Sequence, residues 1–594
     1  MQGWKQRLLS KAGKEILIKA VAQAIPVYAM SCFEITKTLC DEISAMIGRY
    51  WWSSADKDNK IHWVSWDKLT SPKKDGGLGF RDLYSFNLAM LAKQAWRLLK
   101  NPNSLSAKVL AAKYYPGGNI LEAEAKSGMS YCWRSILKGI QVLKEGIIWR
   151  IGNGQTINIW SDPWLPRDES RKIRSVRGNQ IITKVCELIN PSSNNWDTQL
   201  LNQTFNAEEV KIIKTIPIQD GAIDNIAWHF DKKGNFSVKS AYQVVQNIKK
   251  KEEEQGSSSM DITNEGNNKI KWKKLWSIPL PGKVKHFLWR LANNSLPFRM
   301  KLKRKGINLD TRCPVCYRLD EDGGHCFLKC KHVKAFWREA ELEEIRLQLL
   351  KCPDAKWFII HILDQNEENC MKIGTLLWIW WKERNTANQG KRIRNLGEIL
   401  YSFQFLFSQF WEHLKKRKEK KQSKMQVWSP PPEDFLKINS DGAFREMTRS
   451  GGWGFILRNE MGKALIAGAG PLHDIANPLQ AEAMAMYHAI QEVARMGCQN
   501  LILETDASIL RQALTSDMYD NADLGNLFRD MRLLIRLSFK CCIIQNCPRT
   551  CNIVAHQLAA YGAVQEREAY QVWLDPFPTA VKNVIAGVCP ACVN

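Results

Sequence analysis

Long apolar runs and regular cysteine spacings are both missing from this sequence of 594 residues. No run of about 18 apolar residues occurs, so we expect no membrane-spanning helix. The start of the chain is basic and amphipathic without a continuous apolar core, which argues against a secretory signal. The 17 cysteines follow no repeating framework, so we expect an intracellular, reduced protein whose cysteines at metal spacing are ligands rather than disulfide partners.

Two more absences narrow the possibilities. The glycines of GGLGF, residues 76–80, lack the G-x-G-x-x-G spacing after a strand, so they predict a turn and not a dinucleotide-binding loop. No tandem repeat is present, and the length predicts three to five domains of roughly 100–200 residues each. The 24 tryptophans either fill several small cores or stack on nucleobases, and we favour the cores.

Positive charge is in large excess and is unevenly distributed. The formal net charge of +25 and the isoelectric point of about 9.3 predict an anionic partner, most commonly nucleic acid. Residues 431–594 hold 14 Lys and Arg against 17 Asp and Glu, whereas the rest of the chain holds 71 against 43. The upstream region should therefore supply the electrostatic attraction.

The first 235 residues are predicted to be mostly helical. Apolar positions at three- and four-residue spacing run through residues 1–50 and return in FNLAMLAKQAWRLL, residues 86–99. The stretch WRIGNGQTINIWSDPWL, residues 149–165, instead predicts a hairpin that turns at Asn153-Gly154. Residues 339–414 are expected to form a helical connector.

Two polar segments interrupt the chain. Residues 249–268 are nearly free of apolar side chains and predict a disordered insertion. Residues 415–432 predict a linker that ends in Pro430-Pro431-Pro432 and begins with six basic residues: Lys415, Lys416, Arg417, Lys418, Lys420 and Lys421. That cluster is typical of a nuclear import signal or a phosphate-binding arm, and equally of a solvated helix end. Nuclear localisation, with the cytoplasm as alternative, is accordingly an expectation only.

After the prolines the periodicity changes to that of an α/β domain. Alternating runs predict three strands at 435–444, 451–462 and 463–472, and a long helix follows over 479–497. A strand at 500–507, two helices within 508–538, a strand at 540–549 and a last helix at 552–564 complete the order βββαβααβα. The domain should span residues 433–567, with residues 568–594 as a tail.

Three acids occupy matching places in this pattern. Asp441 is predicted to end the first strand, Glu482 to lie in the first turns of the long helix, and Asp506 to end the fourth strand. If the first and fourth strands are neighbours the carboxylates converge, and their repulsion requires a cation. Oxygen ligands favour Mg²⁺ or Mn²⁺, and two such ions about 4 Å apart would suit phosphodiester hydrolysis. A single Asp at a strand end is more often a turn residue, so the combination carries the prediction.

A second constellation lies in CPVCYRLDEDGGHCFLKC, residues 313–330. Cys313 and Cys316 form a C-x₂-C pair, and His325 and Cys330 follow as an H-x₄-C pair. This spacing predicts one tetrahedral Cys₃His zinc site, in which four protein ligands leave no open position, so the metal is structural. Reduced core cysteines are the alternative. Cys326, beside His325, is expected to point elsewhere.

The motifs of the predicted C-terminal α/β domain resemble the type 1 ribonuclease H family, in the form found in plant retroelement-derived proteins. The resemblance rests on INSDGA, GGWGFILRNEMGK, LQAEAMAM, LETDA and PRTCNIVAHQLAA, and covers about residues 435–565. It implies cleavage of the RNA strand of RNA–DNA hybrids with two Mg²⁺ ions held by Asp441, Glu482 and Asp506. Water would be the nucleophile, and the products would carry 5′-phosphate and 3′-hydroxyl ends.

One position departs from the family pattern. His556 stands where the well-studied type 1 enzymes have a fourth acid, although the plant branch often has histidine there. A neutral imidazole could ligate metal or move a proton, but it removes one negative charge. As a plain structural residue it would be a half-buried helix histidine. By the same resemblance, Arg549 and Asn552 could contact the hybrid backbone.

Two stretches near the cysteines are FSVKSAYQVV, residues 236–245, and WKKLWSIPLPGKVKHFLWRLANNSLPFRMKLKRKG, residues 272–306. They resemble the zinc-binding domain that follows reverse transcriptase in plant LINE-type retroelements. We expect this domain at 236–338, after a post-polymerase region at 1–235. Its basic and aromatic surface is a plausible nucleic-acid contact, for which the candidates are Lys283, Lys285, Lys301, Lys303, Arg304 and Lys305. The polymerase hallmark, an aromatic-Ala-Asp-Asp turn, is missing because the chain has no Asp-Asp dipeptide. We therefore expect the C-terminal half of such an element, without polymerase activity.

The sequence thus predicts a multidomain protein with a mainly helical N-terminal region, a small Cys₃His zinc domain and a C-terminal α/β ribonuclease H-like domain. Its expected function is nucleic-acid binding and metal-dependent hydrolysis of the RNA strand of RNA–DNA hybrids. The alternatives are a catalytically idle protein that binds RNA or DNA, and a transposon remnant without function.

Overall fold

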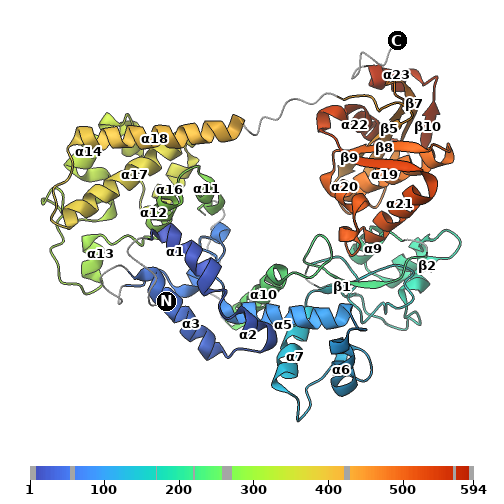
Figure 1. The fold of residues 1–594 in the computed structure, drawn as a ribbon, viewed down its shortest axis with the longest axis horizontal. Helices are drawn as coiled ribbons and strands as arrows, with labels where there is room; N and C mark the ends of the chain where they lie inside the picture. The colour runs from blue at the N-terminus through green and yellow to red at the C-terminus, as the bar shows by residue number, and fades with distance from the viewer. Residues whose placement is uncertain are drawn as a thin grey trace. The chain divides into compact units, whose positions relative to one another are not determined.

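The computed structural model describes residues 9–53, 61–168, 170–218, 221–256, 270–419, 428–565 and 570–586. The chain divides into two compact units, each built from separated segments (Figure 1). The first comprises Met1–Leu91, Lys126–Ile136 and Gln246–Ser423, and the second Ala92–Ala125, Leu137–Val245 and Lys424–Asn594. The domain boundaries expected at 235, 338, 414 and 432 stay predictions.

Helices make up the first unit, as the spacing of apolar residues predicted. Side-chain caps start several of them: Thr36 accepts a hydrogen bond from the Leu39 amide, and Asn366 from the Asn369 amide. No helix in the described ranges is long and apolar enough to cross a membrane. The elements are α1 (Lys11–Leu17), η2 (Ile18–Ala22), α2 (Val27–Cys32), α3 (Lys37–Trp52), α4 (Trp66–Thr70), η3 (Lys73–Asp75), α11 (Trp272–Ser277), α12 (Gly282–Ala292), α13 (Arg299–Arg304), η6 (His325–Lys329), α14 (Lys331–Glu339), α15 (Glu343–Leu349), α16 (Ala355–Asp364), α17 (Glu367–Asn388) and α18 (Leu396–Glu419). Three more helices contribute residues to both units: α5 (Leu83–Lys100), α7 (Tyr131–Lys144) and α10 (Val238–Gly256).

Buried tryptophans fill the core of the first unit. Trp289, Trp337 and Trp380 are almost fully buried, and each indole N–H donates to a backbone carbonyl, at 2.9, 2.8 and 2.7 Å respectively. The partner of Trp289 is Gly76, so the N-terminal segment and the segment after residue 270 share one core. For these three tryptophans the expected role in packing is confirmed, because a buried indole with its donor satisfied is not available to a nucleobase.

The two predicted polar segments are partly helical. Residues 249–256 complete α10, and the basic stretch from Lys415 belongs to the end of α18. Lys415 and Lys416 are exposed there, in agreement with a solvated helix end. Residues 257–268 and 420–427, which contain the rest of both predictions, lie outside the described residues.

The hairpin predicted at 149–165 is wrong. Strand β1 (Ile147–Arg150) pairs antiparallel with β4 (Asn225–Trp228) instead. The carboxylate of Asp224 accepts hydrogen bonds from the amides of Gly152, Gly154 and Thr156 at 2.7–2.9 Å. These three amides therefore donate to a side chain just before β4, and they are not available for the backbone hydrogen bonds of the predicted hairpin.

The same upstream part of the second unit contains a small hairpin and several short helices. Its apolar core includes Ile157, Trp164 and Leu201. The elements are α6 (Leu105–Tyr114), η4 (Ile120–Glu122), η5 (Val185–Leu188), β2 (Ile189–Asn190), β3 (Asn195–Trp196), α8 (Thr198–Thr204) and α9 (Ala207–Lys214).

The C-terminal part of the second unit is a six-stranded mixed sheet in the order β10-β7-β6-β5-β8-β9 (Figure 1). Strands β5, β6 and β7 form an antiparallel meander, while β5, β8 and β9 run parallel. The predicted order βββαβααβα is confirmed. Its elements are β5 (Leu436–Arg445), β6 (Ser450–Arg458), β7 (Ala464–Leu472), α19 (Pro478–Arg495), β8 (Asn500–Thr505), α20 (Ser508–Thr515), η7 (Asp517–Tyr519), α21 (Gly525–Ser538), β9 (Cys541–Asn546), η8 (Arg549–Cys551) and α22 (Ile553–Gly562).

Helices cover both faces of this sheet. One core joins the sheet to α19, α20 and α21, and a second, smaller core lies under α22. Glycines in β6 let α22 approach: a Cβ at Gly454 would lie 2.2 Å from the Ala559 amide nitrogen. The predicted tail is wrong in its described part, because β10 (Gln571–Leu574) extends the sheet beyond β7 and α23 (Thr579–Ala586) buries Val581 and Ile585 against the second core. The C-x₂-C pair of Cys589 and Cys592, for which a dangling tail is the expectation, lies outside the described residues.

Candidate functional site

Three carboxylates from three elements of the second unit meet at one point. Asp441 comes from β5, Glu482 from the second turn of α19, and Asp506 directly follows β8. One carboxylate oxygen from each lies within 4.8 Å of those of the other two. The convergence that the sequence predicted is therefore present among the described residues.

The backbone explains why these acids meet. Strands β5 and β8 are parallel neighbours whose pairing ends at Asn439 and Glu504, so Asp441 and Asp506 extend past the same edge of this ladder. The prediction that Asp441 ends its strand is wrong, because antiparallel pairing of β5 with β6 continues to Arg445. Next to it, a Cβ at Gly442 would lie 2.2 Å from the Ala481 carbonyl carbon, so glycine lets α19 bring Glu482 close.

The site is electrostatically unfavourable without a cation. Burial raises the pKa of Glu482 to about 9, and the neighbouring charges of Asp441 and Asp506 add to this effect. Burial also raises the pKa of Asp441 above its ordinary value. Glu482 Oε2 and Asp506 Oδ1 are buried without a hydrogen-bond partner among the described residues. An all-oxygen donor set with excess negative charge and unpartnered oxygens fits one or two hard divalent ions.

These pKa shifts predict that the site lowers the stability of the metal-free protein. Between pH 4.5 and about 9 the folded site holds a proton that the unfolded chain releases, so the free energy of unfolding falls as the pH rises. Glu482→Gln removes one of the three charges and should raise the melting temperature in magnesium-free buffer at pH 8 by about 5 °C or more. Thermal unfolding at pH 6 and pH 8 tests this. An unchanged melting temperature at pH 8 would contradict it.

His556 lies on α22 beside the carboxylates. Its Nδ1 is 2.6 Å from Asp441 Oδ2, which is hydrogen-bond distance. The side chain is 70% exposed, so the alternative of a half-buried structural histidine is wrong. The imidazole therefore borders the site from the solvent side, where it can accept or donate a proton.

Two further residues expected to contact a nucleic-acid backbone behave differently. Arg549 is 92% exposed, and its Nε donates to Asp506 Oδ2 at 3.1 Å. Asn552 is 2% exposed, and its Nδ2 donates to the Ser440 carbonyl at 2.9 Å, which ties the start of α22 to β5. A contact with nucleic acid is thus open to Arg549, whereas the expectation for Asn552 fails because its side chain is buried.

A fourth acid near the site is neutralised. Glu504, two residues before Asp506, receives a salt bridge from Lys437 at 3.0 Å and hydrogen bonds from Asn439 and Gln545 at 2.9 and 2.8 Å. The sequence analysis did not consider this residue, although it shares a strand face with Asp506. Since its carboxylate is fully engaged, it is a supporting residue and no metal ligand.

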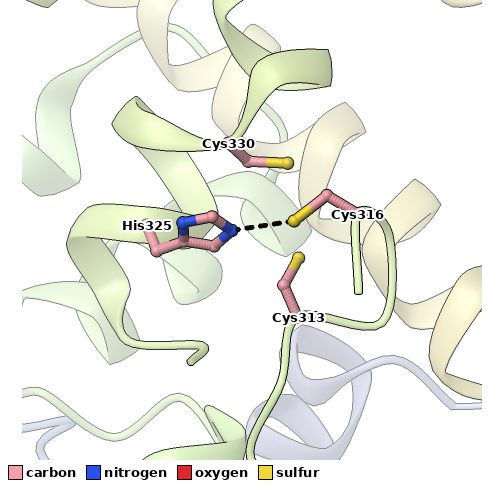
Figure 2. A group of neighbouring side chains, drawn as sticks. All are labelled: Cys313, Cys316, His325 and Cys330. Atoms are coloured by element: carbon pink, nitrogen blue, oxygen red, sulfur yellow. Dashed lines mark hydrogen bonds between the residues drawn. The ribbon is translucent and has the colours of Figure 1, made fainter. Parts of the chain in front are cut away.

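The second cluster joins Cys313, Cys316, His325 and Cys330 in the first unit. Figure 2 shows the three sulfur atoms and the imidazole pointing toward a common centre. Their ligand atoms lie within 4.8 Å of one another, and His325 Nε2 is 3.3 Å from Cys316 Sγ. Contact with Cys330 lowers the pKa of Cys313 to about 5, and the same contact raises the pKa of Cys330. Three sulfurs and one imidazole nitrogen fit tetrahedral zinc.

The loop that carries this cluster is fixed from both sides. Tyr317 takes a left-handed conformation at φ 55°, which turns the chain after the C-x₂-C pair. Asp322 Oδ1 accepts from the His325 amide at 2.6 Å, and fully buried Glu321 accepts from Arg384 of α17 at 2.6 Å. No local pattern in the sequence indicates this long-range ion pair. Cys326 lies outside the cluster and is buried in the core.

The basic residues expected to bind nucleic acid fall into two groups. On α12, Lys283 stacks on Trp378 at 4.8 Å from the ring centre, and Lys285 donates to the Trp276 carbonyl at 2.9 Å. Around α13, Lys301 lies 5.0 Å over the Trp63 ring, and exposed side chains follow at Lys303, Arg304 and Lys305. The second group presents more free charge to solvent.

Comparison with known proteins bears on both sites. Residues 236–337 match the family described as zinc-binding in reverse transcriptase, and residues 439–562 match the family described as reverse transcriptase-like. An Arabidopsis thaliana protein whose name is "Uncharacterized mitochondrial protein" is 43% identical over 143 residues, which cover 24% of this chain and 93% of that one. The chain belongs to the retroelement-related family that these proteins represent. The chain carries a zinc-binding domain of the reverse transcriptase type and a ribonuclease H-like domain.

A longer relative is similar to this chain over most of its length. It is an Arabidopsis thaliana protein whose name is "Putative ribonuclease H protein", 26% identical over 546 residues, or 89% of this chain and 85% of that one. Two solved structures are similar over 22% of this chain with TM-scores of 0.20. One is RNase H1 from Halobacterium salinarum, 26% identical and covered to 96%; the other is an N-terminal RNase H domain from Mycobacterium tuberculosis, 18% identical and covered to 92%.

Proposed function

We propose that this protein binds nucleic acid and hydrolyses the RNA strand of RNA–DNA hybrids. The observation that supports the proposal is the convergence of Asp441, Glu482 and Asp506, with two carboxylate oxygens buried and unpartnered. Such a site gains stability from divalent ions, and its donor set suits Mg²⁺ or Mn²⁺. The match to the reverse transcriptase-like family agrees with this chemistry.

The chain's own residues have distinct parts in the proposed reaction. When bound, two divalent ions would neutralise the carboxylates and stabilise the negative charge that develops on the phosphate oxygens. Asp441, Glu482 and Asp506 would hold them, and water would be the nucleophile, leaving 5′-phosphate and 3′-hydroxyl ends. Arg549 can exchange its contact with Asp506 for a phosphate. The net positive charge of the upstream region would attract the polyanion.

Zinc at Cys313, Cys316, His325 and Cys330 is the second part of the proposal. The ligand atoms come from a C-x₂-C turn, from the start of η6 and from Cys330 directly after η6, and they lie in contact with the main core of the first unit. With four protein ligands the site has no open position, so the ion would be structural.

A nucleic-acid-binding protein without catalysis is the second candidate. Two observations favour it: Arg549 and His556 both occupy oxygens of the proposed metal ligands, and His556 contributes no fixed negative charge. This alternative predicts binding that weakens steeply with salt, without cleavage in Mg²⁺ or Mn²⁺.

His556→Asp tests what the histidine does to turnover. A fourth carboxylate beside Asp441 adds negative charge, so the variant should bind Mg²⁺ more tightly and cleave a hybrid about tenfold faster at low Mg²⁺. The measurement is the initial rate of full-length protein on RNA–DNA hybrid, double-stranded RNA and double-stranded DNA over a Mg²⁺ series. Cleavage of the hybrid alone by both proteins supports the nuclease. Slower cleavage by His556→Asp at every Mg²⁺ concentration would show that the imidazole itself is required.

A further inference from the structure

The second unit joins its C-terminal sheet domain to an upstream part, residues 147–235, through polar contacts. Asn526 of α21 donates its Nδ2 to the Ile151 carbonyl at 2.6 Å, and Asn521 donates to Asn235 Oδ1 at 2.8 Å. The match to the reverse transcriptase-like family begins only after this upstream part. The upstream part is therefore outside the family's domain, yet it contacts that domain directly.

One contact of the upstream part reaches the helix that carries Glu482. Gln480, in the first turn of α19 and 5% exposed, donates its Nε2 to the Thr215 carbonyl at 3.3 Å. Thr215 caps the C-terminal end of α9, where backbone carbonyls lack partners within the helix. The Oε1 of the same Gln480 side chain accepts from the Ala476 amide at 2.9 Å, just before α19. The side-chain amide of Gln480 thus joins the start of α19 to the upstream part.

The start of α19 is packed differently on its two sides. On the side of β5 the backbone contact is tight, because a Cβ at Gly442 would lie 2.4 Å from the Glu482 amide nitrogen. On the upstream side a cavity of about 240 Å³ remains, and it is lined in part by Thr215, Ile216 and Gln480. Since packing is incomplete on that side, the hydrogen bond from Gln480 is a direct link that can hold the start of α19 in place.

We propose that Gln480 is a positioning residue through which the upstream part sets the affinity of the carboxylate site for divalent ions. Residues two apart on a helix do not face the same way, so Gln480 contacts the upstream part while Glu482 meets Asp441 and Asp506. A metal ligand must be held to within about 0.5 Å, so a shift at the start of α19 should weaken metal binding. This inference rests on the metal site of the proposed function and not on cleavage.

The test uses the full-length, zinc-loaded protein and Mn²⁺ alone as the probe. Calorimetric titration gives the dissociation constant for Mn²⁺, and Asp441→Asn shows which part of the signal belongs to the carboxylate site. Gln480→Met keeps the approximate size of the side chain and removes both hydrogen bonds, while Gln480→Asn keeps an amide on a shorter side chain. Asn235→Ala is the matched control, because it removes a hydrogen bond of the same interface that ends at Asn521, outside α19.

We expect both Gln480 variants to bind Mn²⁺ about fivefold more weakly, and Asn235→Ala to change less than about twofold, with equal zinc content in all three. Hybrid cleavage by Gln480→Met should be slow at low Mg²⁺ and recover at high Mg²⁺ with an unchanged KM for the hybrid, whereas a general loss of structure would not recover. Parent-like Mn²⁺ affinity in the folded Gln480 variants, an equal loss in Asn235→Ala, or no Mn²⁺ binding by the parent would overturn the inference. Weaker Mn²⁺ binding by the variants of a parent that cleaves no hybrid would support the inference and contradict the nuclease proposal alone.

Discussion

Removal of the metal from the Cys₃His cluster is expected to unfold much of the first unit. Cys313, His325 and Cys330 are buried, and the residues between them, Phe327 and Leu328, belong to the main core. Without a metal, three sulfurs and an imidazole crowd together in that core with no compensating charge. Zinc binding by small structural sites contributes about 10–16 kcal/mol at neutral pH, so its loss exceeds the stability of an ordinary domain.

Cys316→Ser provides the test, with Cys352→Ser as the matched control. Cys352 is a partly exposed cysteine of the same unit outside the cluster. Cys316→Ser should lose the single bound zinc ion and lower the melting temperature by more than about 10 °C. The control should keep both. Elemental analysis and thermal unfolding give the two readings, and a Cys316→Ser protein that lacks zinc yet unfolds at the same temperature as the parent would contradict a structural metal.

Asp441→Asn is expected to reduce cleavage of an RNA–DNA hybrid by about 10³-fold or more. Asp441 is the only one of the three acids that also contacts His556, so its loss removes a ligand and the partner of the imidazole together. Asparagine keeps the size of the side chain, and burial raises the pKa of Asp441, so the charge of this carboxylate does not favour the metal-free fold. The variant should therefore be at least as stable as the parent.

A matched control separates the local role of Asp441 from its charge. Glu446 is an exposed acid just after the same strand, so Glu446→Gln removes an equal charge outside the site. Its rate should stay within twofold of the parent. A similar loss of rate in both variants, or a stable Asp441→Asn protein with undiminished cleavage, would place the chemistry elsewhere.

Local signals were enough for the C-terminal fold from β5 to α22 and for both clusters. Alternating runs gave its strands, the spacing of apolar residues gave its helices, and Asp441 and Asp506 met because their strands turned out to be parallel neighbours. The Cys₃His spacing needed only short-range geometry. In each case the information lies within a few residues, where backbone periodicity decides the structure.

Long-range pairings were beyond the reach of such signals. Strand β1 pairs with β4, about 75 positions later in the chain, because the Asp224 side chain accepts hydrogen bonds from the amides after β1. Strand β10 pairs with β7, which lies far earlier in the chain. The exposure of His556 and the burial of Asn552, four residues apart, depend on how α22 sits on β5 and β6. The ion pair between Glu321 and Arg384 likewise forms only after α17 packs.

The most direct measurement of the proposed function is strand-resolved cleavage of an RNA–DNA hybrid by the full-length protein. Each strand carries a different label, and Mg²⁺ is either present or withheld. The account predicts products from the RNA strand alone, with 5′-phosphate and 3′-hydroxyl ends, only when Mg²⁺ is present, and none from the Asp441→Asn protein. An intact RNA strand after incubation with folded, zinc-loaded protein in Mg²⁺ or Mn²⁺, or equal cutting by Asp441→Asn, would contradict it.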